Sequence, residues 1–149
     1  MRFMVITKAT ADSEAGVLPA PEDFVTMGNF IQELVDAGVL LAADGLHPSA
    51  KGVRIYFDGE KQTVVDGPFT ETKELIAGYF LMETKSLEEC VEWFKRYPIL
   101  QPDGAQTNIE IRRVALAEDF GEEFSEEFTA ELRESVDKRH AAVEGHGNN

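Results

Sequence analysis

The feature that most restricts the fold of this 149-residue chain is a strand with apolar side chains on both faces. Arg2–Lys8 alternates so that Phe3 and Val5 share one face, while Met4 and Ile6 share the other. Ile76–Glu83 shows the same property. A sheet that is apolar on both faces needs cover on both. The chain must therefore provide or recruit a packing layer on each side of the sheet.

Apolar periodicity, turn residues and capping signals predict the other elements. The predicted strands are Arg2–Lys8, Val39–Ala43, Val53–Phe57, Lys61–Val65, Ile76–Glu83 and Asn108–Val114. The predicted helices run from Pro21 to Gly38, from Ser86 to just before Pro98, and over Ser125–His140. Ser86 forms a capping box with Glu89. Asp58-Gly59 is the predicted hairpin turn, and Ala9–Ala20 and Gly45–Gly52 are predicted loops.

The resulting order is β-α-β-(β-β)-β-α-β. Without the inserted hairpin it is the split β-α-β arrangement of a ferredoxin-like α+β fold. Its two helices cover one face of the sheet. The third helix is a poor second cover, because its apolar residues recur every four positions and drift around the helix. We therefore expect a homodimer that packs sheet against sheet.

Composition excludes several classes of partner. The formal net charge is −14, which disfavours binding to nucleic acid or to an anionic membrane. The single cysteine, Cys90, excludes an internal disulfide and a cysteine metal cluster. No apolar run is long enough to span a membrane, and no signal peptide is present, so we expect a cytoplasmic protein. No nucleotide motif or metal-ligand spacing occurs, and no cofactor is expected.

The C-terminal part of the chain is the most acidic. Residues 117–149 hold 10 acidic and 3 basic residues, a composition typical of solvated surface. We therefore predict a folded domain over residues 1–116. An acidic helical extension over residues 117–149 follows, with a disordered end from Gly145 to Asn149.

A rigid turn, Asp66-Gly67-Pro68-Phe69, separates two strands. Proline fixes its own φ and restricts the residue before it, and Asp66 can cap the turn with its side chain. Three charged residues follow: Glu71, Lys73 and Glu74. They form either an exposed turn with local ion pairs or, with Asp66, one wall of a ligand pocket.

Three further residues are candidates for a site. His47 lies in a loop after a strand and is either a general base or a surface histidine. Arg54 lies in a strand and either binds a carboxylate ligand or pairs with an acid of the chain. Tyr79 is either a ligand-binding residue or a core aromatic residue with a bonded hydroxyl.

Several of these motifs resemble the DGPF branch of the YCII-related family over roughly residues 1–116. The resemblance rests on Gly45-Leu46-His47-Pro48, Arg54, the nine residues DGPFTETKE at 66–74, Gly78-Tyr79, Trp93 and Ile109-Glu110-Ile111-Arg112. It implies a dimeric α/β-barrel-like fold. It also implies relatives among small lyases and dehydrochlorinases that resemble muconolactone isomerase, and some DGPF proteins are encoded beside alternative sigma factors.

One feature departs from the family pattern. The shorter YCII proteins pair a histidine in the first helix with an aspartate just after the second helix. Here Glu22–Ala37 contains no histidine, and the segment after the second helix reads Arg96-Tyr97-Pro98. That pair cannot be transferred to this chain.

Three functions remain open from the sequence. The first is a dimeric protein that binds a small anionic ligand in a pocket beside the DGPF turn, with Arg54, Lys73, Glu74 and Tyr79 as binding residues. The second is a lyase or isomerase that uses His47 or Asp66 as general acid or base. The third is a regulatory companion of an alternative sigma factor.

Overall fold

The computed structural model describes residues 1–71, 73–100, 106–121 and 130–138. The chain divides into two compact units, Met1–Val114 and Ala115–Asn149. The described part of the second unit contains a short 3-10 helix, Ala117–Phe120, and a helix over residues 130–138. The other positions of the predicted third helix, 125–129 and 139–140, lie outside the described residues.

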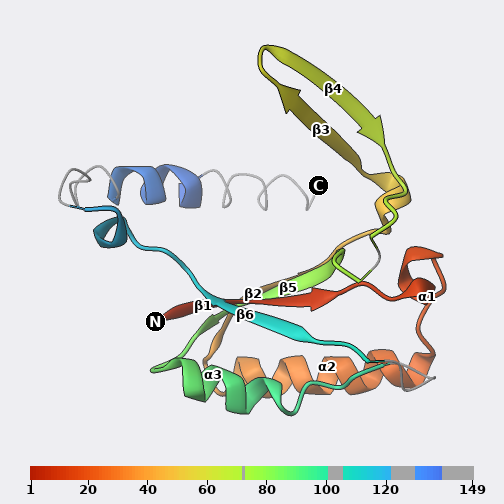
Figure 1. Cartoon of the computed structure of the whole chain (residues 1–149). Coiled ribbons are helices and arrows are strands. Elements are labelled where there is room, and N and C mark those ends of the chain that lie inside the picture. The colour runs from red at the N-terminus through yellow and green to blue at the C-terminus, as the bar shows by residue number, and fades with distance from the viewer. Residues whose placement is uncertain (72, 101–105, 122–129, 139–149) are drawn as a thin grey trace, which may run out of the picture. The chain divides into compact units, whose positions relative to one another are not determined.

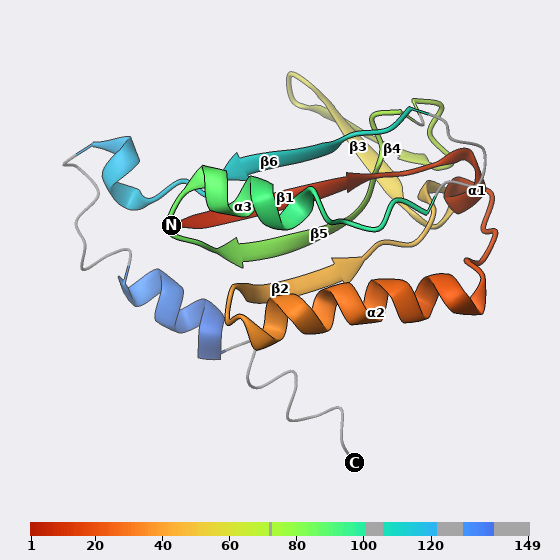
Figure 2. The same ribbon diagram turned by 90° about the horizontal axis from the view of Figure 1, so that it is seen from below.

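The first unit contains a four-stranded antiparallel sheet with the order β2-β5-β1-β6. Its strands are β1 (Arg2–Lys8), β2 (Leu40–Gly45), β5 (Ile76–Glu83) and β6 (Ile109–Arg113). Helices α2 (Pro21–Asp36) and α3 (Leu87–Phe94) lie on the same side of this sheet (Figure 1). Seen from the helix side, α2 runs beside β2 (Figure 2). This connectivity and strand order confirm the predicted ferredoxin-like α+β fold.

The inserted hairpin forms a separate two-stranded sheet from β3 (Val53–Asp58) and β4 (Lys61–Asp66). Asp58 pairs with Lys61, so the turn is centred on Gly59 and Glu60, one residue later than predicted. Gly59 has φ +59°, a conformation that glycine adopts without strain at the first central position of a hairpin turn.

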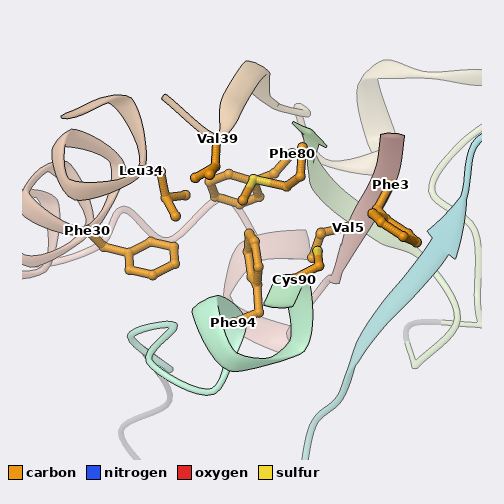
Figure 3. Packing of buried hydrophobic residues seen from close by; sticks show 9 residues of the cluster. Phe3, Val5, Phe30, Leu34, Val39, Phe80, Cys90 and Phe94 are labelled. Atoms are coloured by element: carbon orange, nitrogen blue, oxygen red, sulfur yellow. The ribbon is translucent and has the colours of Figure 1, made fainter. Parts of the chain in front are cut away.

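The core fills the space between the sheet and the two helices (Figure 3). Alternation along the strands directs Phe3, Val5, Phe80 and Met82 to this side, and helical spacing directs Phe30 and Leu34 to meet them. Phe30, Phe80 and Phe94 pack edge to face, with ring centroids 5.2 to 6.3 Å apart. The three rings come from α2, β5 and α3, so their contacts hold both helices against the sheet.

Two local predictions need correction. The segment Ala9–Ala20, predicted as a loop, contains the short helix α1 (Ala11–Glu14). Thr10 and Ser13 cap it reciprocally, each accepting a hydrogen bond from the other's backbone N–H. At α3, Ser86 Oγ accepts from Glu89 N as predicted. The Glu89 carboxylate, however, accepts from Lys85 N, one residue before the cap, so the predicted capping box is only half formed.

The side of the sheet turned away from α2 and α3 is here called the open face. Alternation and strand register assign to it Met4, Ile6, Tyr79, Leu81, Glu110 and Arg112. Among the described residues of the first unit, no helix covers this face. The residues that the structure describes also contain no helix long and apolar enough to cross a membrane.

The cysteine offers a direct test of core packing. The Cys90 side chain is fully buried, and burial raises the pKa of its thiol to about 11. The thiolate is the reactive form of cysteine. An aromatic disulfide reagent at mildly alkaline pH should therefore label Cys90 only when the protein unfolds around it. Absorbance should show slow labelling in buffer and rapid labelling in denaturant. Equal rates in the two conditions would contradict the packing described here.

Candidate functional site

Two cavities lie at the end of the sheet where β1 and β2 finish and α2 begins. The first, of about 410 Å³, includes Thr10, Asp12 and Ser13 around α1 and is here called the α1 cavity. The second, of about 360 Å³, includes Phe24, Met27 and Ile31 of α2 and is here called the α2 cavity. Both volumes fall in the range of small-molecule sites.

The two cavities adjoin one another. Six residues line both of them: Thr7, Pro19, Asp23, Ala77, Tyr97 and Leu100. They come from β1, the loop before α2, α2 itself, β5 and the segment after α3. A single ligand can therefore contact groups from every layer of the first unit.

Apolar and aromatic groups dominate the wall of the α2 cavity. Helical spacing places Phe24, Met27 and Ile31 on one side of α2, and Phe80 faces them from β5. The Tyr97 ring packs against Phe30 and Phe80 with centroids 5.8 and 6.0 Å away. Burial raises the pKa of the Tyr97 phenol, so its hydroxyl stays protonated and can donate a hydrogen bond across the neutral range.

Among the described residues, Asp23 is the one charged residue that lines both cavities. It is partly buried, and its Oδ2 accepts a hydrogen bond from Ala20 N at 3.3 Å. Within the described part of the chain, no lysine, arginine or histidine forms an ion pair with it. The buried Thr7 hydroxyl, also on the shared wall, donates to Gly78 O at 3.2 Å. Asp23 is therefore the carboxylate acceptor available to a ligand on this wall.

Most of the site residues proposed from the sequence lie elsewhere. His47, Asp66, Lys73 and Glu74 are exposed, and none of them lines either cavity. Among the described residues, these four side chains make no hydrogen bond or ion pair with one another.

Tyr79 is the exception, because it is among the residues that line the α2 cavity, although alternation directs its side chain to the open face. Its hydroxyl donates to Asp44 Oδ2 at 2.8 Å, across the β2–β5 pair. This hydrogen bond, together with the negative charge of Asp44, raises the pKa of Tyr79. The hydroxyl is therefore held by the protein itself.

The DGPF turn packs closely on the 3-10 helix η1 (Ser49–Lys51). Gly67 N donates to Gly52 O at 2.9 Å, and a Cβ at position 67 would lie 1.8 Å from Ser49 O. Phe69 N donates to Ser49 Oγ at 2.9 Å. Glycine is required here because the two backbones approach too closely for any side chain.

Ser49 connects this turn to α1. Its backbone N–H donates to Glu14 Oε1 at 3.0 Å, and its hydroxyl donates to Glu14 Oε2. Glu14 is the last residue of α1, whose preceding residues Asp12 and Ser13 line the α1 cavity. The DGPF turn is thus linked to the wall of a cavity without lining it.

Arg54 forms an ion pair with one of the charged residues that follow the turn. Its guanidinium carbon lies 3.9 Å from the centroid of the Phe69 ring, and its Nη1 lies 3.3 Å from Glu71 Oε2. Interactions with Tyr56 and then with Glu71 raise the pKa of Arg54. Hydrogen bonds from the Glu71 backbone and from Arg54 lower the pKa of Glu71. Arg54 therefore pairs with an acid of its own chain.

Sequence reasoning missed Asp23, Thr7 and Tyr97. In the sequence, Asp23 is an ordinary acid at the start of a helix, and Tyr97 is a residue beside Pro98. The resemblance described above contained a clue to this site. The shorter YCII proteins pair a residue of the first long helix with a residue just after the second. Asp23 and Tyr97 come from these same two elements.

Comparisons with known proteins found a matching family and individual similar proteins. The YCII-related domain matches residues 1–115. An uncharacterized protein of Rhizobium meliloti (strain 1021) is 29% identical over 85 residues, which cover 57% of this chain and 67% of that protein. The solved structure of 5-chloro-2-hydroxyhydroquinone dehydrochlorinase from Burkholderia phenoliruptrix AC1100, in complex with 2,5-dihydroxybenzoquinone, is 13% identical, with a TM-score of 0.41. The match covers 80% of this chain and 98% of that one.

The close packing at Gly67 can be tested against a matched glycine. Gly67→Ala should destabilise the protein by roughly 1–3 kcal/mol, because the new methyl group collides with backbone atoms of Ser49. Gly52→Ala is the control, since its Cβ would lie 3.5 Å from the same Ser49 oxygen, an ordinary contact. Denaturant unfolding measures both. If the two variants unfold alike, the turn is not held against η1.

Proposed function

Since this chain belongs to the YCII-related family, we propose that it binds a small organic molecule in the α2 cavity and the adjoining α1 cavity. The observation that carries the proposal is the shared wall, on which Asp23, Thr7 and Tyr97 converge from three different elements. A concave, mainly apolar site with a few polar groups is the usual form of a ligand site.

In this proposal the DGPF turn supports the pocket from outside. The turn holds Ser49, and Ser49 holds Glu14 at the end of α1. Thr10, Asp12 and Ser13 of the α1 cavity belong to that short helix or to its cap. A four-residue helix has little stability of its own, so its position depends on such contacts.

Catalysis by His47 or Asp66 has less support. Both side chains are exposed, and neither is among the described residues that line the α1 cavity or the α2 cavity. A general base must lie within hydrogen-bond reach of a bound substrate, which requires a binding site around it. Ligand binding at the shared wall therefore remains the function that the geometry favours.

We also propose that the protein is a homodimer that packs open face against open face. Met4 and Leu81 are register neighbours in the middle of that face, and Met4 is 36% exposed. The hairpin adds apolar surface, because Val53, Ile55, Phe57 and Val64 share one of its sides and are all more than half exposed. A two-stranded hairpin is marginally stable alone, and contact with a second copy supplies the missing packing.

Sedimentation tests the homodimer. The wild-type protein should sediment at about twice the chain mass of 16.6 kDa, and Leu81→Lys should sediment as a folded monomer, because it buries a charge at the centre of the interface. Val25→Lys is the control, since it adds the same charge at an exposed apolar position of α2. A monomeric wild-type protein would rule out the proposal.

NMR with a neutral aromatic probe tests the ligand site. Benzyl alcohol at millimolar concentration should shift the amide signals of Thr7, Asp23 and Tyr97, which line both cavities. The amides of His47 and Lys73 are the internal control, because these residues lie outside both cavities. Shifts confined to the neighbourhood of His47 and Lys73 would move the site to the DGPF turn and contradict the assignment made here.

A further inference from the structure

The charges and rings around the α2 cavity indicate the kind of ligand that it accepts. Asp23 and Asp44 are among its described lining residues, and none of these is a lysine, arginine or histidine. The Asp44 carboxylate bonds the hydroxyl of Tyr79, whose side chain belongs to the open face, so Asp23 is the carboxylate left to meet a ligand in the cavity. Phe24, Phe80 and Tyr97 also line the cavity. Carboxylates and ring faces both attract cations.

Asp23 is the group best placed to bind such a cation. Asp44 accepts the Tyr79 hydroxyl at 2.8 Å on the open face, whereas among the described residues Asp23 accepts a longer bond, from Ala20 N at 3.3 Å. An ionised carboxylate has two acceptor oxygens and about four lone-pair sites. Most of the acceptor capacity of Asp23 is therefore free for a donor from a ligand.

The net charge of the chain also favours a positively charged ligand. At −14, the protein attracts cations and repels anions at long range. The sequence indicated an anionic ligand through Arg54 and Lys73, but these residues line neither cavity. Lys8 is the one basic residue among the described residues that line the α1 cavity, and Asp12 and Asp23 line it as well.

We infer that the α2 cavity binds an organic ammonium ion, an aromatic or aliphatic amine whose apolar body lies against Phe24 and Met27 and whose charged nitrogen donates to Asp23. This inference rests on the proposed function, since it assigns a ligand class to the same site. Tyr97 and Phe80 supply ring surface that stabilises the cation further.

Three probes of nearly equal shape test the ligand class: benzylamine, benzyl alcohol and benzoate, which are cationic, neutral and anionic at neutral pH. NMR titration should give about tenfold tighter binding for benzylamine than for benzyl alcohol, the size expected for a charge-assisted hydrogen bond. Benzoate should bind most weakly. Benzoate binding as tightly as benzylamine would overturn the inference.

Two variants distinguish the effect of the Asp23 carboxylate on affinity from the effect of the net charge of the protein. Asp23→Asn should reduce benzylamine affinity about tenfold, to that of benzyl alcohol, and should leave benzyl alcohol unaffected. Asparagine keeps an acceptor for Ala20 N, so α2 should remain capped. Glu22→Gln removes the same charge from the neighbouring residue, which does not line the cavity, and should preserve the preference for benzylamine.

The outcomes distinguish this inference from the proposed function. If Asp23→Asn retains the full preference for benzylamine, the ammonium assignment fails. If benzyl alcohol still binds at Thr7 and Tyr97 in that case, the cavity remains a ligand site. If none of the three probes shifts the amides of the cavity residues, both the inference and the proposed function fail.

Discussion

The edge-to-face contacts of Phe30, Phe80 and Phe94 hold the first unit together, because the rings come from both helices and from the sheet between which the core lies. They fix α2 and α3 against the sheet, and Tyr97 extends the same cluster beyond the end of α3. Phe80 and Tyr97 also line the α2 cavity. The floor of the proposed site is therefore continuous with the core, which gives the cavity a rigid wall on which ligand groups can be positioned.

The DGPF segment illustrates how a specific motif can have a structural role. Gly67 is needed for a close backbone approach, and Phe69 supplies an N–H for Ser49 and a ring face for Arg54. Each residue thus fixes the base of the hairpin. Among the described residues, hydrogen bonds link the motif to the proposed site through Ser49 and Glu14, which hold α1 in place.

The two sides of the four-stranded sheet have different packing partners. One side packs two helices and leaves space for a ligand at the end where α2 begins. The other side presents Met4 and Leu81 and, in our proposal, meets a second copy. Since alternate residues of β1 and β5 face opposite sides, a substitution at one face changes one of these functions while leaving the other largely intact.

The sequence by itself determined the strands, the two covering helices, the hairpin and so the ferredoxin-like fold, because alternation, helical spacing and turn residues are local patterns. The short helix α1 was missed, because four residues show no apolar period, and its reciprocal caps Thr10 and Ser13 are seen only in the structure. The grouping of Thr7, Asp23 and Tyr97 was decided only by tertiary structure. These residues are up to 90 positions apart, and each has an ordinary local role in a strand, a helix start or a loop. Only the packing of α2 and the segment after α3 against the sheet brings them to one wall, and no local pattern records that packing.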